Sequence, residues 1–144
     1  MISVDAPNGA HLHRLEYRVP FFDTDAMGVV HHAKYLHLFE LGRVRWMDEY
    51  HRPYTDYVER GLHLAVTQAR VDYHASARFD DRLEITTWLA WVRGASLAMS
   101  YTIYKGDLLI ASGTTEHAAV DNEGRVRRIP REDRQQLSAQ ASPG

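Results

Sequence analysis

The spacing of hydrophobic residues changes in the first third of the chain, from the period of a strand to that of a helix. Residues 15–20 (LEYRVP) alternate apolar and polar side chains, which predicts a half-buried strand that ends at Pro20. Residues 34–50 instead repeat with the period of a helix. The apolar stripe of this helix consists of Tyr35, Leu38, Phe39, Gly42, Trp46 and Tyr50. Gly42 costs about 1 kcal/mol of helix propensity but allows a close neighbour, so we expect tight packing against a sheet.

Four further strands are predicted after Gly61. Residues 62–73 alternate, and a one-residue change of phase near Gln68 indicates a β-bulge. The other three strands, rich in β-branched and aromatic residues, are expected at 83–92, 96–104 and 108–121. Turn signals separate the later strands, and we expect all four to follow one another as antiparallel hairpins.

The order of elements is a strand, a long helix and four strands, with a short second helix expected between Pro53 and Val58. This order predicts an α+β fold in which a curved antiparallel sheet wraps around one long central helix. It is similar to the order of the hotdog fold, and an α+β sandwich of another topology is the alternative. We expect one domain at 13–138, with flexible tails at 1–12 and 139–144.

Composition narrows the possible functions. The chain has 144 residues, 44% hydrophobic and 25% charged, as in a single globular domain. A formal net charge of -2 provides no field to attract polyanions, so we expect no nucleic-acid partner. The absence of cysteine excludes thiolate nucleophiles, disulfides and zinc-thiolate sites. Without a signal peptide or an apolar run of about 20 residues, we expect a cytoplasmic protein with no stable membrane insertion.

Residues 21–35 (FFDTDAMGVVHHAKY) resemble the signature of the 4-hydroxybenzoyl-CoA thioesterase family and its Tol-Pal-associated acyl-CoA thioesterase relatives. The matching positions are Asp23, Asp25, Gly28, Val29, Val30, His32 and Tyr35. Further likenesses occur at Asp81, 92–96 and 128–130. The resemblance implies a hotdog fold and hydrolysis of an acyl-CoA thioester, aroyl or short to medium fatty acyl, with no cofactor. It also implies a homo-oligomer, dimer or tetramer, which would cover an open strand of the sheet.

The resemblance makes Asp25 the nucleophile or the general base that acts on the thioester carbonyl. The N-terminus of the following helix would then point at the carbonyl oxygen, and free amides near Gly28 and His32 would form an oxyanion hole. An aspartate just before a helix is ordinarily an N-cap, and this simpler interpretation fits Asp23 better than Asp25.

Two adjacent histidines, His31 and His32, are expected to point apart, and no HExxH pattern accompanies them, so we expect no metal site. The resemblance implies that His32 assists catalysis, since a neutral imidazole near the leaving sulfur can donate a proton or orient water. It also places Val30 and Tyr35 at the substrate, although core packing is the commoner role of a tyrosine on an apolar stripe.

Basic residues after the last strand form either a solvated surface or part of a CoA site. The resemblance places Arg93, Ser96 and Arg128 near the CoA nucleotide, where an arginine fork suits phosphate geometry. Apolar walls for the acyl pocket are expected from Trp46, Tyr50, Tyr57, Val66 and Phe79.

Two other functions compete with hydrolysis. Hotdog hydratases and dehydratases use a His with an Asp or Glu in different motifs, so the Asp-x-Asp-x-x-Gly pattern of residues 23–28 favours a thioesterase. A non-catalytic acyl-CoA-binding protein would keep the pocket, but the intact Asp25 favours an enzyme. No GxSxG, P-loop or GxGxxG pattern supports a serine hydrolase or a nucleotide-binding protein.

Overall fold

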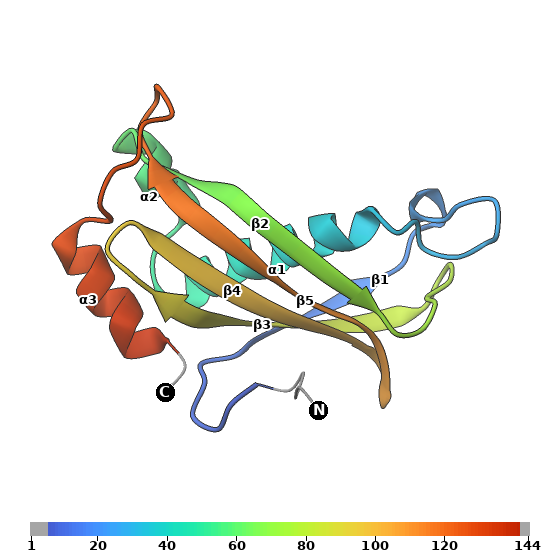
Figure 1. Cartoon of the computed structure of the whole chain (residues 1–144). Coiled ribbons are helices and arrows are strands. Elements are labelled where there is room, and N and C mark those ends of the chain that lie inside the picture. Colours follow the sequence, from blue (N-terminus) through green and yellow to red (C-terminus); the bar gives the residue numbers. More distant parts are fainter. Residues whose placement is uncertain (1–5, 142–144) are drawn as a thin grey trace.

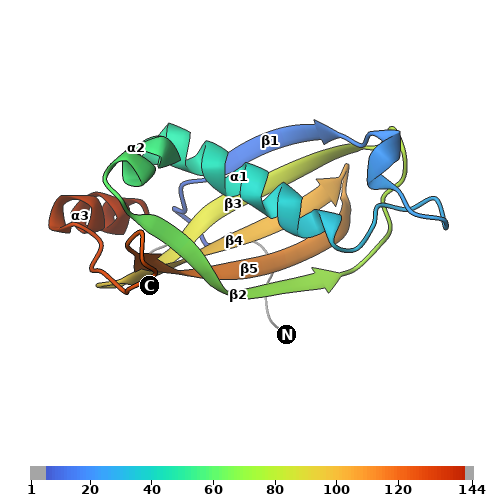
Figure 2. The same ribbon diagram turned by 90° about the horizontal axis from the view of Figure 1, so that it is seen from above.

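Five strands form one antiparallel sheet in the computed structural model, which describes residues 6–141 (Figure 1). The strands are ordered β1-β3-β4-β5-β2 across the sheet. Their bounds are β1 His13–Arg18, β2 His63–Tyr73, β3 Arg82–Val92, β4 Ser96–Lys105 and β5 Leu108–Val120. The helices are a 3-10 turn η1 Phe21–Asp23, α1 Lys34–Tyr50, α2 Tyr54–Glu59 and α3 Arg131–Gln140. The expected α+β fold is confirmed, because the sheet curves around α1 (Figure 2).

Helix α1 has the predicted bounds and buries the predicted stripe, with Tyr50 half-buried at its end. Its closest approach to the sheet is at Gly42, where a β-carbon would lie 2.2 Å from the Thr87 side-chain oxygen. A second close approach involves Gly113 of β5, where a β-carbon would lie 2.5 Å from the Phe39 ring. A larger residue at Gly42 would push α1 away from the sheet, and one at Gly113 would also clash with the Arg70 carbonyl of β2, at 2.2 Å.

The predicted hairpin between β2 and β3 is wrong. Strand β2 pairs with β5, and β3 takes β1 as its second neighbour. The two real hairpins have links of three and two residues, 93–95 and 106–107, whereas residues 74–81 form a longer link. Alternation identified the strands, but it carries no information about their partners. The predicted bulge is confirmed by a shift of register between Val66 and Gln68.

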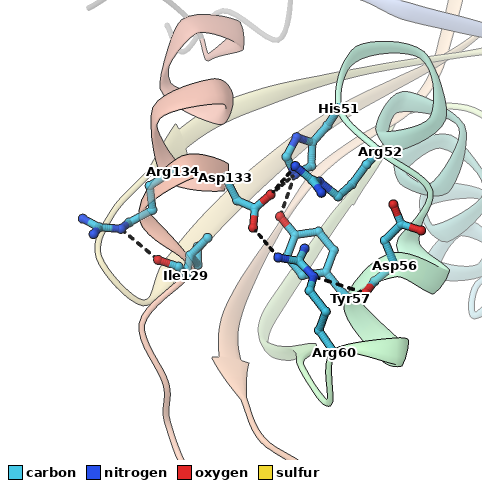
Figure 3. A network of polar contacts seen from close by, with 8 residues as sticks. All are labelled: His51, Arg52, Asp56, Tyr57, Arg60, Ile129, Asp133 and Arg134. Atoms are coloured by element: carbon cyan, nitrogen blue, oxygen red, sulfur yellow. Dashed lines mark hydrogen bonds and ion pairs between the residues drawn. The ribbon is translucent and has the colours of Figure 1, made fainter.

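Helix α3 is held against α1 and α2 by the buried carboxylate of Asp133 (Figure 3). This carboxylate lies 2.8 Å from Arg52 and accepts a hydrogen bond of 2.8 Å from Arg60. The ring of His51 lies 3.6 Å away and is hydrogen-bonded to the Tyr57 hydroxyl at 2.6 Å. The helix continues to Gln140, into the segment for which a tail was expected; residues 1–5 and 142–144 of the expected tails lie outside the described part.

No helix within residues 6–141 is long and apolar enough to cross a membrane.

Replacing Asp133 with Asn should lower the free energy of unfolding by about 2–3 kcal/mol, because two guanidinium groups would lose their buried counter-charge. We expect less than the full cost of a buried pair, since the side chains of Arg52 and Arg60 are 28% and 37% exposed. Urea unfolding would measure the change. As a control, Glu132→Gln on the exposed face of the same helix should stay within about 0.5 kcal/mol of wild type. Equal stabilities for Asp133→Asn and wild type would contradict this account.

Candidate active site

Residues 24–33, between η1 and α1, form a tight loop at the end of the molecule opposite α3 (Figure 1). The Asp25 amide donates to the Val29 carbonyl, and the Gly28 amide donates to the Asp25 carbonyl, both at 2.9 Å. Gly28 has a φ of +80°, a conformation that favours glycine. The loop therefore depends on glycine at this position to fold back on Asp25.

The carboxylate of Asp25 is fixed through one of its two oxygens. Its Oδ1 accepts hydrogen bonds from the amides of Met27, at 2.9 Å, and Val29, at 3.4 Å. Among the residues that the structure describes, Oδ2 has no hydrogen-bond or ion-pair partner, and Asp25 is partly exposed. One oxygen is therefore held in place by the backbone while the other stays available to a substrate or a water molecule.

The interpretation of Asp23 as an N-cap is wrong. The residue that precedes α1 is Ala33, which provides no side-chain cap. Asp23 is instead buried, accepts a hydrogen bond of 2.5 Å from the Tyr17 hydroxyl and pairs with Lys34 at 3.1 Å. Burial, together with the Asp23 carboxylate, raises the pKa of Tyr17. Asp23 thus joins β1 to the first turn of α1 and holds the base of the loop.

Two expectations about the segment before α1 are not met, one for the two histidines and one for Gly28. Their rings stack at a centroid distance of 4.3 Å, so the expectation that they point apart is wrong. The Gly28 amide is not free, as it is bonded to Asp25. The His32 amide, by contrast, has no acceptor within residues 6–141, and the Tyr73 hydroxyl holds the His32 carbonyl at 2.8 Å. Of the two positions expected to form an oxyanion hole, Gly28 and His32, only His32 therefore has a free amide within the described residues.

Val30 and Tyr35 lie beneath the loop, in the hydrophobic core. The Val30 amide donates to the carbonyl of Ala77 at 2.8 Å. The ring of Tyr35 meets that of Tyr73 edge to face at 5.4 Å, and burial raises the pKa of Tyr35. Both residues support the loop from below, so their structural contacts indicate a positioning role.

The residues expected to contact CoA come together at the turn between β3 and β4. The Arg128 side chain reaches Gly94, with 3.3 Å between its guanidinium and the position of a β-carbon there. The Arg93 guanidinium lies 4.0 Å from the centre of the Trp91 ring, and its backbone amide donates to the Ser96 carbonyl at 2.7 Å. Arg93, Ser96 and Arg128 thus surround one turn.

This turn and Asp25 lie at opposite ends of the sheet. The Asp25 loop touches the segment before β3, through a bridge between Val29 and Arg78, whereas the turn follows the last residue of β3. Strand β3 has 11 residues, and a strand of that length spans about 36 Å. In Figure 1 the two regions accordingly appear at opposite sides of the molecule. A single chain does not bring them together.

A cavity of ≈ 240 Å³, which we call the chamber, lies between α1 and the strands β2, β4 and β5. It is lined by Glu40, Arg43, Val44, Met47, Tyr54, Leu64, Val66, Leu97, Met99 and His117. Of the predicted pocket walls, only Val66 lines it. Trp46 and Tyr57 are core residues, Tyr50 is half-buried outside the chamber, and Phe79 is exposed and packs edge to face with Phe21.

The chamber contains polar residues that sequence reasoning missed. His117 is only 1% exposed, and its ring is hydrogen-bonded to Thr115 at 2.8 Å and to the Leu64 carbonyl at 3.2 Å. Thr115 is in turn bonded to the Tyr101 hydroxyl at 2.6 Å. The signal was present in the alternation of β5, where 115, 117 and 119 are the inward positions. A histidine between inward-facing threonine and alanine predicts a buried polar group.

Known proteins are similar to this one over most of the length of the chain. Residues 19–139 match the thioesterase-like superfamily. The chain belongs to this superfamily. The acyl-CoA thioesterase YbgC of Haemophilus influenzae is 34% identical over 105 residues, which cover 72% of this chain and 77% of that protein. The acyl-CoA thioester hydrolase YbgC of Escherichia coli O6:H1 is 35% identical over 96 residues, 67% of this chain and 72% of that protein.

The structure of a Thermus thermophilus protein, TT1821, superposes with a TM-score of 0.86 at 29% identity. The match covers 92% of this chain and all of that one. As a member of the thioesterase-like superfamily, the protein is a thioester hydrolase with the hotdog fold. No group of three or more His, Asp or Glu side chains in the described residues is arranged to hold a metal ion.

His117 makes the stability of this thioesterase depend on pH. Burial and the nearby Arg43 lower the pKa of His117 from 6.5 to about 4. The unfolded chain therefore binds a proton more readily, and stability that is complete above about pH 6.5 is lost as the pH falls towards 4, by up to about 3 kcal/mol. His117→Gln, which cannot titrate, should lose less stability over that range in urea unfolding. Identical pH profiles for the two proteins would contradict this prediction.

Proposed function

We propose that this thioester hydrolase acts on acyl-CoA, releasing a carboxylate and free CoA, with Asp25 at the reacting carbonyl. The observation that carries the proposal is the state of the Asp25 carboxylate, with one oxygen held by two backbone amides and the other unpartnered within residues 6–141. An oriented and accessible carboxylate suits attack on a carbonyl or on water. The names of the YbgC relatives support acyl-CoA as the substrate class.

Two routes use the same free oxygen. In the first, Oδ2 of Asp25 adds to the carbonyl carbon and the carbon–sulfur bond breaks; water then hydrolyses the mixed anhydride and restores the carboxylate. In the second, Asp25 takes a proton from water as the hydroxide adds to the carbonyl, and the departing thiolate receives that proton. Both routes give one carboxylic acid and one thiol, and neither requires a cofactor.

The developing oxyanion has a donor ready at the start of α1. The His32 amide lacks an acceptor in the described chain, and its peptide is oriented by the bond from Tyr73 to the His32 carbonyl. The 17 residues of α1 begin two positions later, and a helix N-terminus favours negative charge. The exposed His32 ring, stacked on His31, is the group that would donate a proton to the leaving sulfur.

A second copy of the chain completes the site in this proposal. Both outer strands have unpaired edges, but β1 presents charged Arg14, Glu16 and Arg18, a pattern that protects an edge from pairing. Strand β2 instead presents six consecutive exposed residues, from Ala65 to Arg70, of which only the last is charged. We therefore infer a homodimer in which two β2 strands pair antiparallel about a two-fold axis.

Such pairing would unite the two ends of the site. One end of β2 is joined to the Asp25 loop (residues 24–33) through Tyr73, and its other end lines the chamber through Leu64 and Val66. If the axis passes near Gln68, the middle of β2, the Tyr73 end of one copy lies against the Leu64 end of the other. Asp25 of one copy then faces the chamber of its partner. The turn with Arg93, Ser96 and Arg128 lies at that same end and is our proposed contact for the CoA phosphates.

Replacing Asp25 with Asn should lower kcat for acyl-CoA at least about 100-fold with little change in KM, because the chemical step loses its carboxylate. The amide oxygen of Asn can still accept from Met27 and Val29, so the loop should keep its shape. The release of free thiol would measure the rate.

Asp23→Asn is the matched control. It should lower the free energy of unfolding by about 1–3 kcal/mol, because the buried bonds to Tyr17 and Lys34 weaken, while kcat falls far less than in Asp25→Asn. Near-normal turnover by Asp25→Asn would show that the proposed site is wrong.

A further inference from the structure

The chamber has polar lining residues, among them Arg43 and His117, to which the proposed reaction gives no role. We propose that the chamber receives the acyl group and that Arg43 binds an oxygen acceptor, a carboxylate or a carbonyl, carried by that group at a distance from the thioester. The preferred substrates would then be oxygenated acyl-CoAs rather than plain fatty acyl-CoAs. The inference rests on the proposed function, because it takes Asp25 of a second copy as the group that cleaves the bound thioester.

The size and lining of the chamber suit an acyl group with a polar end. Its ≈ 240 Å³ is several times the ~30 Å³ that one water molecule occupies in the liquid, so the chamber has room for more than a few atoms of an acyl chain. Most of the lining side chains are apolar, namely Val44, Met47, Leu64, Val66, Leu97 and Met99. The ionic groups among the remainder are Glu40 and Arg43, one helical turn apart on α1.

Arg43 has more donors than the described residues can use. Its side chain is 20% exposed, and a guanidinium carries five N–H donors. Its nearest carboxylate is that of Glu40, at 3.5 Å, whose side chain is 64% exposed. An ion pair that is this long and this exposed contributes little to the stability of the protein. Arg43 also lies close to Tyr101, because its positive charge opposes the rise of the Tyr101 pKa that burial causes.

The buried hydrogen bonds behind Arg43, which link Tyr101, Thr115, His117 and the Leu64 carbonyl, run in one donor-to-acceptor direction. The Leu64 carbonyl can only accept, so Nδ1 of His117 donates to it, and in the neutral ring that the lowered His117 pKa implies, Nε2 accepts from the Thr115 hydroxyl. The Tyr101 hydroxyl then donates to Thr115, and its lone pairs stay available to the nearby positive charge of Arg43. His117 is neutral in this arrangement, so the wall carries a cation without a buried counter-charge. A ligand oxygen that reached Arg43 would supply it.

The test compares matched substrates on the full-length protein. Mono-CoA thioesters of the six-, eight- and ten-carbon dicarboxylic acids are set against the fatty acyl-CoAs of equal length. We expect wild type to prefer the dicarboxylic thioester in kcat/KM by at least about tenfold at one or more lengths, as for one charge-assisted hydrogen bond. Arg43→Met keeps the length of the stem but no donor, and should reduce that preference at least about tenfold.

Two further variants separate recognition from folding. Arg45→Met alters an exposed arginine on the same helix that does not line the chamber, and it should leave the preference unchanged. Thr115→Val removes the hydroxyl that links Tyr101 to His117 behind Arg43. It should weaken the preference for dicarboxylic thioesters through KM, with little effect on kcat. No preference in wild type at any length, or an equal loss on both substrate classes in Arg43→Met, would overturn the proposal.

Binding to an inactive protein separates this proposal from the proposed function. In Asp25→Asn, calorimetric titration should give tighter binding of the eight-carbon dicarboxylic thioester than of octanoyl-CoA, and adding Arg43→Met should remove the difference. If wild type hydrolysed none of the six thioesters while Asp25→Asn kept this preference, the proposed function would fail and the chamber assignment would stand. Equal binding of both ligands would overturn the chamber assignment even if hydrolysis were rapid.

Discussion

The rest of the structure depends on how closely α1 packs against the sheet at Gly42. A β-carbon there would lie 2.2 Å from Thr87 Oγ1, so the helix can take this position only with glycine. The same packing buries Leu38, Phe39 and Trp46 against the strands and fixes where the helix begins. The loop of Asp25 is attached to that beginning, and the chamber lies beside the second half of the helix. One close contact therefore sets the positions of both the Asp25 loop and the chamber.

Local patterns predicted most of the fold because each element makes its own hydrophobic face. The bounds of α1 and the bulge beside Gln68 follow from periodicity alone. The partner of β2 cannot be predicted from periodicity, since a strand with one buried face can pair with any neighbour that buries the same face. The link at 74–81 is long enough to leave the sheet edge and contact the Asp25 loop, where the Ala77 carbonyl accepts a hydrogen bond from the Val30 amide. No short-range signal distinguishes this link from a wide hairpin.

The candidate site was predictable where it is contiguous in sequence and unpredictable where it is not. Asp25, Gly28 and His32 lie within eight residues, so a motif could identify them together. The chamber draws its walls from two helices and three strands, and choosing large apolar residues along the chain found only Val66 among them. Asp23 illustrates the same limit: its position before α1 suggested a cap, but its partner Tyr17 comes from β1.

The central claim is that Asp25 of one copy serves the chamber of another. Mixing two inactive variants tests it directly: Asp25→Asn lacks the carboxylate, and Val44→Trp fills the chamber from a partly exposed position on α1. In a mixed dimer, Asp25 of the Val44→Trp copy would face the intact chamber of the Asp25→Asn copy. After subunit exchange at equal concentrations, we predict about one quarter of wild-type activity, because half of the dimers are mixed and each has one working site. Activity no greater than the sum of the two separate variants would show that Asp25 does not act across the dimer.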